Sequence, residues 1–323
     1  MFFMDFVDFS VGKNDEDRRL DKVIRIFIKD APLSQIYKLL RKGLIKVNQK
    51  KSNPDYRIQQ NDVISIAEFL LENQEKSEHQ IKKVVLPQII FQNEHLLILN
   101  KPYDIAVHGK ESLAEQVQAF YESKNQQENS SLSFKTGPLH RLDKKTTGLI
   151  AFSWSLEGAR WFSENIKNHT IKKTYKTILQ GHLQKEEIWE DFIEETHDNL
   201  SSFHTVKASS TSSQNAKNAY SIFTPISYGK YKGMDVTFAQ VQIKTGRMHQ
   251  IRAQSALHKF PLLGDIAYNA KKINETCDLF LHATKLEFPQ ENPLNLPQEI
   301  FAPLPTEFLE FLTKSCDITK FEV

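Results

Sequence analysis

Hydrophobic side chains in the first 70 residues recur with helical spacing and then with strand-like spacing. Between residues 17 and 30, apolar side chains lie three and four positions apart, at Leu20, Val23, Ile24, Phe27 and Ile28. This spacing predicts an amphipathic helix that ends before Ala31-Pro32. A second helix is predicted to begin with Ser34 as its N-cap and to end at Gly43.

A hairpin and then a linker are predicted after the second helix. The stretch LIKVNQKK predicts a strand with a turn at Asn48-Gln49, and DVISIAE predicts the returning strand. Residues 15–69 would therefore form one small helix-helix-hairpin module. The polar stretch LLENQEKSEHQIKKVV carries charges of both signs and predicts a linker over residues 70–86.

Strand patterns dominate from residue 87 onward, so residues 87–323 are predicted to form a second domain. QIIFQNEHLLILNKP predicts two strands around a turn, and TYKTILQG predicts a strand that Gly181 ends. In MDVTFAQVQIKTG the apolar parity changes between Phe238 and Val241, which predicts a β-bulge or bend near Gln240. Helical stretches intervene less regularly than in a βαβ repeat. The fold class expected is therefore α+β, with a mixed, mainly antiparallel sheet and flanking helices.

Composition limits the cellular setting and the partners. Of the 323 residues, 40% are hydrophobic and 25% are charged, and the net charge is only +2, so binding to nucleic acid would require a local basic patch. Cys277 and Cys316 lie far apart, which excludes a disulfide framework and a cysteine zinc site. The N-terminus lacks the pattern of a signal peptide, and no stretch approaches the roughly 18 apolar residues that span a bilayer. We therefore expect a cytoplasmic protein without membrane association.

A local excess of positive charge occurs in the first module. Between Ser34 and Arg57, seven basic side chains accompany a single acid, Asp55. A charge run usually marks a solvated surface, but this imbalance within one small module favours phosphate binding. The order of elements, and the stretch SQIYKLLRKGLIKVN in particular, resembles the S4 RNA-binding domain. The resemblance implies RNA contacts from Arg18, Arg19, Lys38, Arg41, Lys42, Lys46, Lys50 and Lys51.

The stretch HRLDKKTTGLI, residues 140–150, places Asp143 directly before two lysines and a turn-forming Thr-Thr-Gly sequence. A single Asp in such a setting is usually a turn or cap residue. Other chemistries have less support. The inserted Leu142 breaks the kinase H-R-D motif, no G-x-S-x-G elbow is present, and the histidines lack metal-binding spacing.

Three further stretches could contribute to a site. In TGRMHQIRAQ, His249 and Arg252 open a predicted helix, whose N-terminus and guanidinium would together hold an anion. KKTYKTILQG flanks Tyr175 with lysines, and FLHATKLEF predicts an apolar strand through Leu281.

Together these stretches resemble the RluA family of ribosomal large-subunit pseudouridine synthases. HRLDKKTTGLI resembles the family's HRLDxxTSGLL motif, LILNKPYDIAVHG its KPxGxxVH motif, and TGRMHQIRAQ with PLLGDIAY its GRTHQIRVH…HPIxGDxxYG motif. The motifs occur in family order, and the S4 module with the VHG ending favours the subtype called synthase C. The sequence departs from the family pattern at Asp104, Thr147, Ala253-Gln254 and Lys259-Phe260-Pro261.

The resemblance implies an isomerase that converts specific uridines of 23S ribosomal RNA (rRNA) into pseudouridine without a metal or a cofactor. Asp143 would be the catalytic carboxylate and would either attack C1′ or remove a proton from C2′. Arg252 would pair with it, and Tyr175 would stack on the uracil. The substrate would be bound by His140, Arg141, Lys144, Lys145 and Leu281. The implied partner is rRNA, free or in an assembling large subunit, and the implied state is a monomer.

Two alternatives stay open. A pseudouridine synthase that acts on transfer RNA would use the same carboxylate, although the S4 module favours rRNA. A non-catalytic RNA-binding factor for ribosome assembly would keep the fold without activity, although the intact HRLD stretch and Arg252 argue against it.

Overall fold

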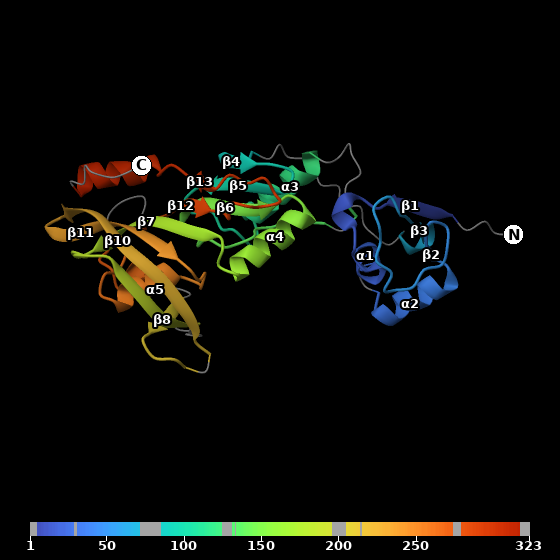
Figure 1. The fold of residues 1–323 in the computed structure, drawn as a ribbon, viewed down its shortest axis with the longest axis horizontal. Helices are drawn as coiled ribbons and strands as arrows, with labels where there is room; N and C mark the ends of the chain where they lie inside the picture. Colours follow the sequence, from blue (N-terminus) through green and yellow to red (C-terminus); the bar gives the residue numbers. More distant parts are fainter. Residues whose placement is uncertain are drawn as a thin grey trace. The chain divides into compact units, whose positions relative to one another are not determined.

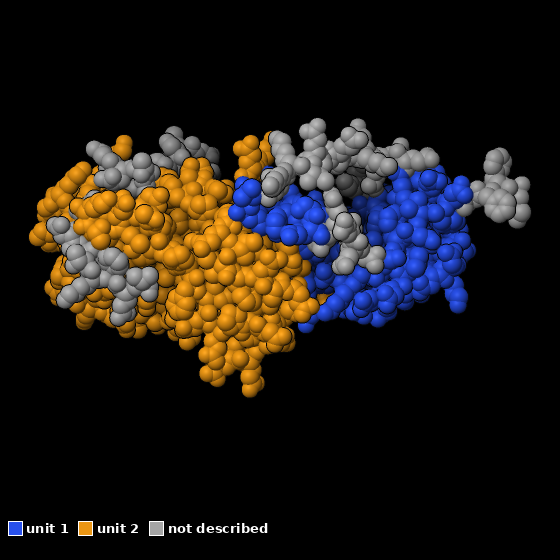
Figure 2. Space-filling view, turned by 90° about the horizontal axis from the view of Figure 1, so that it is seen from above, with its two compact units in different colours: residues 1–86, 115–137, 155–157 blue, residues 87–114, 138–154, 158–323 orange. Residues whose placement is uncertain are grey.

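The computed structural model describes residues 5–28, 31–71, 85–124, 131–132, 134–195, 205–213, 215–273 and 279–316. They belong to two compact units (Figure 1). Unit 1 comprises residues 1–86, 115–137 and 155–157, and unit 2 comprises residues 87–114, 138–154 and 158–323. Figure 2 colours unit 1 blue and unit 2 orange. Most of the linker predicted over residues 70–86 lies outside the described residues.

Unit 1 packs two helices against a three-stranded antiparallel sheet. Helices α1 (Leu20–Phe27) and α2 (Leu33–Lys42) precede strands β2 (Ile45–Val47) and β3 (Val63–Ala67). Strand β1 (Phe6–Ser10) also pairs with β3, so the sheet order is β1-β3-β2. Short helical turns η1 and η2 lie at Lys13–Asp15 and Glu68–Leu70. The predicted helix-helix-hairpin is confirmed, but the sequence pattern missed β1.

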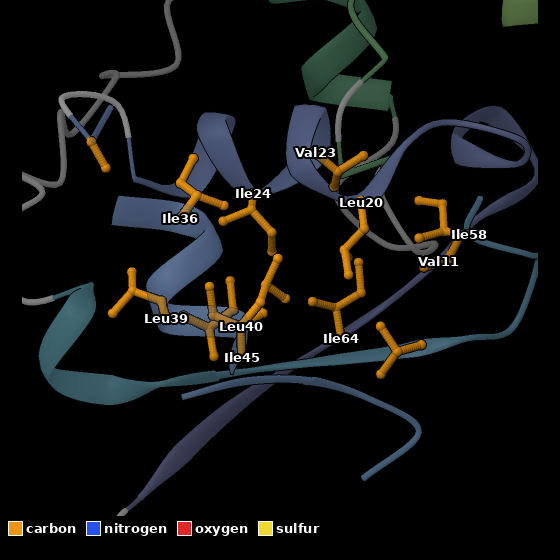
Figure 3. Close-up of a cluster of buried hydrophobic side chains, with 13 residues drawn as sticks. Val11, Leu20, Val23, Ile24, Ile36, Leu39, Leu40, Ile45, Ile58 and Ile64 are labelled. Carbon is orange, nitrogen blue, oxygen red and sulfur yellow. The ribbon is translucent and has the colours of Figure 1, made fainter. Parts of the chain in front are cut away.

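The core of unit 1 lies between these helices and the sheet. The helical spacing places Leu20, Ile24, Ile36 and Leu40 on inward faces, where each is at most 1% exposed. Figure 3 shows them directed toward the strands, where Ile45 and Ile64 complete the cluster. Burying an aliphatic side chain of this size contributes about 1.5–3 kcal/mol, so the apolar stripe of each helix explains its docking.

The two ends of α2 follow different rules. Gly43 has φ 73° in the left-handed region, which confirms the predicted C-terminal stop. Ser34 is not the N-cap, because the helix begins at Leu33 with Pro32 in the extended capping position and without a side-chain cap. The proline ring fixes φ near −65° and so already sets the entry into the helix.

The predicted turn after β2 and a segment from later in the chain complete unit 1. Asn48 and Gln49 have φ values of 49° and 64°, as a two-residue hairpin turn requires. The buried Asp15 carboxylate accepts hydrogen bonds from the Ser131 hydroxyl (2.7 Å) and the Leu132 amide (2.8 Å). These bonds join residues 131–132, which follow helix α3 (Leu113–Lys124), to the same compact unit.

Unit 2 is built on one ten-stranded sheet of order β4-β5-β6-β12-β7-β11-β10-β8-β9, with β13 paired to β12. Its strands are β4 (Ile89–Gln92), β5 (Leu96–Lys101), β6 (Thr147–Ser153), β7 (Lys172–Gln180), β8 (Glu187–Glu195), β9 (Val206–Ser209), β10 (Lys217–Tyr231), β11 (Met234–Ile243), β12 (Leu281–Glu287) and β13 (Glu299–Phe301). Among the described strands, only β6 and β12 run parallel. The expected α+β class with a mixed, mainly antiparallel sheet is confirmed.

Helices α4 (Leu156–Lys167), α5 (Gln250–Leu257) and α6 (Thr306–Glu310) pack against this sheet. Short helical turns η3 and η4 lie at Ile266–Tyr268 and Phe311–Ser315. Phe162 of α4 packs with Leu96 and Ile98 of β5, and Phe308 of α6 packs with Ile178 and Phe238. Ala253 of α5 belongs to a third cluster with Ile193. Helix α5 carries a single charged side chain, Arg252, which lies at the candidate site described below.

The bulge predicted near Gln240 lies instead in the neighbouring strand. The register between β10 and β11 shifts between Pro225 and Ser227, which pair with Ala239 and Phe238. Strand β11 itself pairs with β7 without interruption. Residues 236–239 of β11 are buried on both faces, and a strand buried on both faces loses its alternating pattern. The change in the apolar alternation of the sequence therefore reflects the burial of β11 on both faces and does not mark a bulge in β11.

Candidate active site

Asp143 lies in the turn that leads into strand β6. The Thr146 amide donates a hydrogen bond of 3.0 Å to the Asp143 carbonyl, and the chain then enters β6. Gly148 of β6 has φ 105°, and a Cβ atom there would lie 2.3 Å from the carbonyl oxygen of Ala283 in β12. Only glycine allows this approach. The close contact between β6 and β12 fixes where the turn presents the Asp143 side chain.

The Asp143 carboxylate is mostly buried and faces a guanidinium. Its side chain is 15% exposed, and Oδ2 lies 3.3 Å from Nη1 of Arg252 on α5. Asp265 holds the same guanidinium through Nε–Oδ2 at 2.7 Å and Nη2–Oδ1 at 2.8 Å. A bidentate pair fixes the plane of the guanidinium. Arg252 is therefore anchored by Asp265 and makes a single, longer contact with Asp143.

Arg252 is a permanent cation in this setting. Burial by itself would lower the pKa of Arg252, but the hydrogen bonds and charge of Asp265, with a contribution from Asp143, outweigh burial and raise it. The guanidinium carbon also lies 5.0 Å from the ring centroid of Tyr268, a cation–π distance. A buried anion is tolerated only next to such a fixed counter-charge.

His249 is the second group beside Asp143. It immediately precedes α5 with φ 50°, and its Nε2 lies 3.6 Å from Oδ2 of Asp143. Its Nδ1 lies 3.0 Å from the Tyr268 hydroxyl, which accepts a hydrogen bond from the Val206 amide. Burial lowers the pKa of His249, which favours a neutral ring. The ring therefore lies between the two groups, with Nδ1 facing the Tyr268 hydroxyl and Nε2 facing the Asp143 carboxylate.

A cavity of about 190 Å³ opens beside Asp143. Tyr175 of β7 and Leu281 of β12 line it and are 6% and 5% exposed. Burial, and then the charge of Asp143, raise the pKa of Tyr175, so its phenol keeps its proton. Apolar lining comes from Leu139, Leu142, Ile166, Ile243 and Ile251. The structure thus brings Asp143, Tyr175, Arg252 and Leu281 to one largely apolar cavity.

The four other predicted substrate-binding residues surround Asp143 on two sides. His140 and Arg141 line the same cavity, whereas Lys144 and Lys145 line an adjoining hollow that shares Asp143 and Arg252. Arg141 and Lys144 are exposed.

His140 is a half-buried ring that is neutral at pH 7. Its Nε2 accepts a hydrogen bond of 3.0 Å from the Ala151 amide, and the ring stacks on Phe162. Burial, and then the charge of Lys173, lower the pKa of His140 to about 3. The hydrogen of the neutral ring is therefore on Nδ1, which is buried without a hydrogen-bond partner among the described atoms.

Lys101 at the end of β5 holds the loops around Lys144. Its side chain is fully buried, and Nζ donates hydrogen bonds of 2.8–2.9 Å to the carbonyls of Pro102, Ile105 and Lys144. Asp104, one of the departures from the family pattern, has φ 62° and pairs with Lys144 at 3.1 Å. Asp104 therefore adopts a backbone conformation that glycine adopts more readily, and it adds an exposed ion pair.

The loop before α5 is held by the buried amide of Gln250. Its Oε1 accepts hydrogen bonds from the Thr245 hydroxyl (2.8 Å) and the Arg247 amide (3.0 Å). Its Nε2 donates to the Ser221 hydroxyl, which in turn donates to Gln254. Gln254, another departure, is fully buried and donates to the Asp191 carboxylate at 2.8 Å. This network ties α5 to β8 and β10 and so sets the direction of Arg252.

Three charged residues that line the site, Asp265, Lys173 and Arg247, were not predicted from the sequence. Asp265 lies in PLLGDIAY, where a single acid within an apolar stretch was the available signal. Lys173 lies two residues before Tyr175 on β7, so strand alternation directs both to one face. That spacing was the available signal for Lys173, which also lines the cavity.

The basic residues predicted to bind RNA in unit 1 fall into two groups. Arg19 forms a bidentate pair with the buried Asp21, at 2.8 and 3.2 Å, and Arg18 is half-buried. The others have no carboxylate partner among the described residues, and all are exposed except the half-buried Lys46, which lies over the Phe6 ring: Lys38, Arg41, Lys42, Lys46, Lys50 and Lys51.

The described residues carry no signal for a metal site or for a membrane-spanning helix. No cluster of three or more His, Cys, Asp or Glu side chains with metal-binding geometry occurs there. None of the helices described there combines the length and the apolar character needed to cross a bilayer.

Two protein-family models match the chain. The model for RNA pseudouridylate synthase matches residues 95–257, about half of the chain, and the S4 domain matches residues 18–64. The ribosomal large subunit pseudouridine synthase C of Pasteurella multocida is 27% identical over 94% of this chain and 92% of its own length. An uncharacterized RNA pseudouridine synthase of Mycoplasma capricolum is 28% identical over 87% of this chain and 91% of its own length.

Solved structures share the fold. Human RNA pseudouridylate synthase domain containing 4 superposes with a TM-score of 0.56 at 21% identity, over 70% of this chain and 92% of that protein. Human RNA pseudouridylate synthase domain containing 1 also gives a TM-score of 0.56 at 21% identity, over 73% and 89%. At these identities the likeness concerns the fold alone. The family model, which matches residues 95–257, is the finding that assigns the family. This protein belongs to the RNA pseudouridylate synthase family.

Proposed function

We propose that this protein is a pseudouridine synthase that acts on RNA of the large ribosomal subunit, with Asp143 as its catalytic carboxylate. The observation that carries the proposal is the buried contact of 3.3 Å between Asp143 and Arg252, beside a cavity that Tyr175 lines. A carboxylate with a fixed counter-charge and a neighbouring aromatic ring meets the needs of a rearrangement at ribose. Family membership supplies the reaction type.

The reaction exchanges one glycosidic bond for another. The N1–C1′ bond of uridine breaks and its electron pair leaves with the uracil, which turns so that C5 bonds to C1′. C5 then loses its proton and N1 gains one, which gives the neutral isomer. Asp143 would either attack C1′ or take a proton from C2′. In both routes Arg252 orients the carboxylate, and Asp265 in turn fixes the guanidinium plane.

The cavity would hold the base during this exchange. The target uridine must leave its helix or lie in a loop, because its sugar and base edges are inaccessible within a stack. Tyr175 would stack on the released ring, a contact worth roughly 1–3 kcal/mol. Leu281 would pack beside it, and His140 and Arg141 line the same cavity.

The choice of RNA rests on two observations. The similar proteins of Pasteurella multocida and Vibrio vulnificus carry the name ribosomal large subunit pseudouridine synthase C, and residues 18–64 match the S4 domain. The exposed cations of unit 1 would contact phosphates of structured RNA, and Lys144 and Lys145 would contact phosphates next to the target. We infer that the substrate is 23S rRNA, free or in an assembling large subunit, and that the protein acts as a cytoplasmic monomer without a metal or cofactor.

A pseudouridine map of total rRNA, compared between cells with and without the gene, tests the proposal. Loss of pseudouridine at defined large-subunit positions is expected, with restoration by the wild-type gene and not by an Asp143→Asn variant. Unchanged rRNA together with a loss in transfer RNA would reassign the substrate. Protein that binds rRNA but never forms pseudouridine in either RNA would instead indicate an assembly factor.

A further inference from the structure

One buried lysine of the cavity has no hydrogen-bond or ion-pair partner within the part of the chain that the structure describes. Lys173 is 7% exposed and lines the cavity with Asp143 and Tyr175. Among the described residues, its ammonium group forms no hydrogen bond, ion pair or contact with an aromatic ring. Lys101 is buried as deeply but donates to three carbonyls. An unpaired buried ammonium is unfavourable, which indicates that its acceptor arrives with the substrate.

The surroundings of Lys173 favour a base as this acceptor. Strand alternation directs Lys173 and Tyr175 to one face of β7, and Lys173 pairs in register with the apolar Ile243 of β11. Gly246 leaves room for the Lys173 ammonium group, because a Cβ atom at position 246 would lie 3.2 Å from Nζ of Lys173. A phosphate would keep its water more easily near the exposed Arg141 than in this apolar interior.

We propose that the Lys173 ammonium stabilises the uracil ring as it leaves C1′ and is therefore an additional catalytic residue, an inference that rests on the function proposed above. When the N1–C1′ bond breaks, the ring takes the electron pair and carries one negative charge shared by N1 and the O2 and O4 oxygens. The ammonium donates a hydrogen bond to a carbonyl oxygen of this anion without transferring its proton. The negative charge is neutralised when C5 bonds to C1′. C5 then loses its proton to water and N1 gains a proton, so the rearrangement consumes and releases no net proton. A preorganised donor in a largely apolar cavity is suited to such developing charge.

The protonation states around Lys173 are compatible with this role. Burial alone lowers the pKa of Lys173 to about 8, so the ammonium form predominates at pH 7. The other titratable or charged groups that line the cavity are His140, Arg141, Asp143, Tyr175, Arg247, His249 and Arg252. The pKa values of His140 and His249 are lowered and that of Tyr175 is raised. All three pKa values are therefore shifted away from pH 8, where Lys173 would titrate.

The test uses the full-length protein and an unmodified large-subunit rRNA transcript labelled with tritium at C5 of uridine. Formation of the C5–C1′ bond releases this tritium, so its release measures turnover. The variants are Lys173→Met, Lys173→Arg and the control Lys172→Met, which alters the exposed neighbour on the opposite face of β7. We expect Lys173→Met to lower the single-turnover rate by about 10²-fold with RNA affinity within about twofold. We expect Lys173→Arg to recover much of the rate and Lys172→Met to change it by less than about threefold.

Two further readouts separate catalysis from a structural role. The kcat/KM of the wild type should fall as pH rises through about 8, whereas that of Lys173→Arg should not. Because folding depresses the pKa of Lys173 from 10.5 to about 8, the wild type should gain stability between these pH values. Lys173→Met should lack this gain and should unfold at a higher temperature than the wild type at pH 7, since the buried charge is gone.

Several results would overturn the inference. An unchanged single-turnover rate in Lys173→Met would remove Lys173 from the chemistry. Weaker RNA binding with an unchanged rate at saturating RNA, and a salt slope reduced by about one, would assign Lys173 to a phosphate. A lower unfolding temperature of Lys173→Met at pH 7 would assign it to structure. If the wild type itself released no tritium from rRNA, the proposed function would fail, which is a different outcome from failure of the Lys173 variants alone.

Discussion

Positive charge is arranged in opposite ways in the two units. In unit 1, Lys38, Arg41 and Lys42 lie exposed on α2 without carboxylate partners among the described residues. In unit 2, Arg252 and Lys173 are largely buried beside one cavity. Two charges 4 Å apart interact by about 1 kcal/mol in bulk water and by several kcal/mol where water is displaced. The effect of exposed cations therefore depends on how many there are, whereas the effect of a buried cation depends on where its charge is held.

Under the proposed function, this difference would separate RNA binding from chemistry. Many weak, exposed contacts suit the backbone of a large RNA, because each phosphate offers the same charge and none specifies a base. A few buried charges suit a single reacting uridine, because their directions are set by neighbours such as Asp265. Substitutions in unit 1 should therefore change affinity and its salt dependence, whereas substitutions in the cavity should change the rate.

The largest expected effect comes from Asp143→Asn. The variant keeps the shape of the side chain and removes the carboxylate, so we expect turnover to fall by at least about 10³-fold. RNA affinity should stay within about twofold, because the exposed cations are intact. Tritium release and filter binding measure the two quantities, and Asp104→Asn, an exposed carboxylate paired with Lys144, is the matched control. Wild-type turnover in Asp143→Asn would refute the assignment of the catalytic carboxylate.

Replacing one glycine in each unit with alanine compares how much the stability of each unit depends on a glycine with positive φ. Gly148→Ala would bring Cβ within 2.3 Å of a backbone oxygen of β12 at φ 105°, so we expect a loss of stability of roughly 3 kcal/mol or more. Gly43→Ala at φ 73° would meet only the flexible Lys51 side chain at 3.0 Å, so about 1 kcal/mol is expected. Thermal unfolding measures both. Equal losses would show that the contact between β6 and β12 tolerates a side chain.

Asp265→Asn tests whether Arg252 needs its anchor. The variant keeps a polar group but loses the charge of the bidentate pair, so Nη1 is no longer held toward Asp143. We expect kcat to fall by about 10- to 100-fold, or about 1.4–2.8 kcal/mol, with little change in KM. Asp235→Asn, which removes an exposed carboxylate paired with Lys230 at 2.6 Å, is the control and should change kcat by less than about twofold. An effect on KM alone would place Asp265 in RNA binding.

The smallest expected effect per residue comes from the exposed cations of α2. Replacing Lys38, Arg41 and Lys42 together with Gln should lower the slope of log affinity against log salt by about 2 and leave the single-turnover rate unchanged. Binding titrations between low and physiological salt measure the slope. The control replaces three exposed lysines of unit 2, Lys167, Lys232 and Lys314, with Gln. Equal slopes for the two triple variants would argue against a special role for α2.

Local patterns predicted much of unit 1. The spacing of Leu20 and Ile24 predicted α1, and Gly43 predicted the end of α2, because both signals act within a few residues. Strand β1 was missed because its pairing with β3 lies more than 50 residues away along the chain. The bulge was misplaced because burial on both faces of β11 imitated a change of parity.

At the candidate site, the amino-acid sequence by itself determined which residue types stand in each motif, and the family resemblance attached expected roles to Asp143, Tyr175 and Arg252. The distances belong to the tertiary structure, because Asp143 and Arg252 are 109 positions apart and meet only through the pairing of β6, β12 and β7 and the docking of α5. The same packing decided that Arg252 has a partner in Asp265 while Lys173 has none among the described residues. Pairing and burial depend on all the neighbours of a side chain at once, so a local pattern does not contain them.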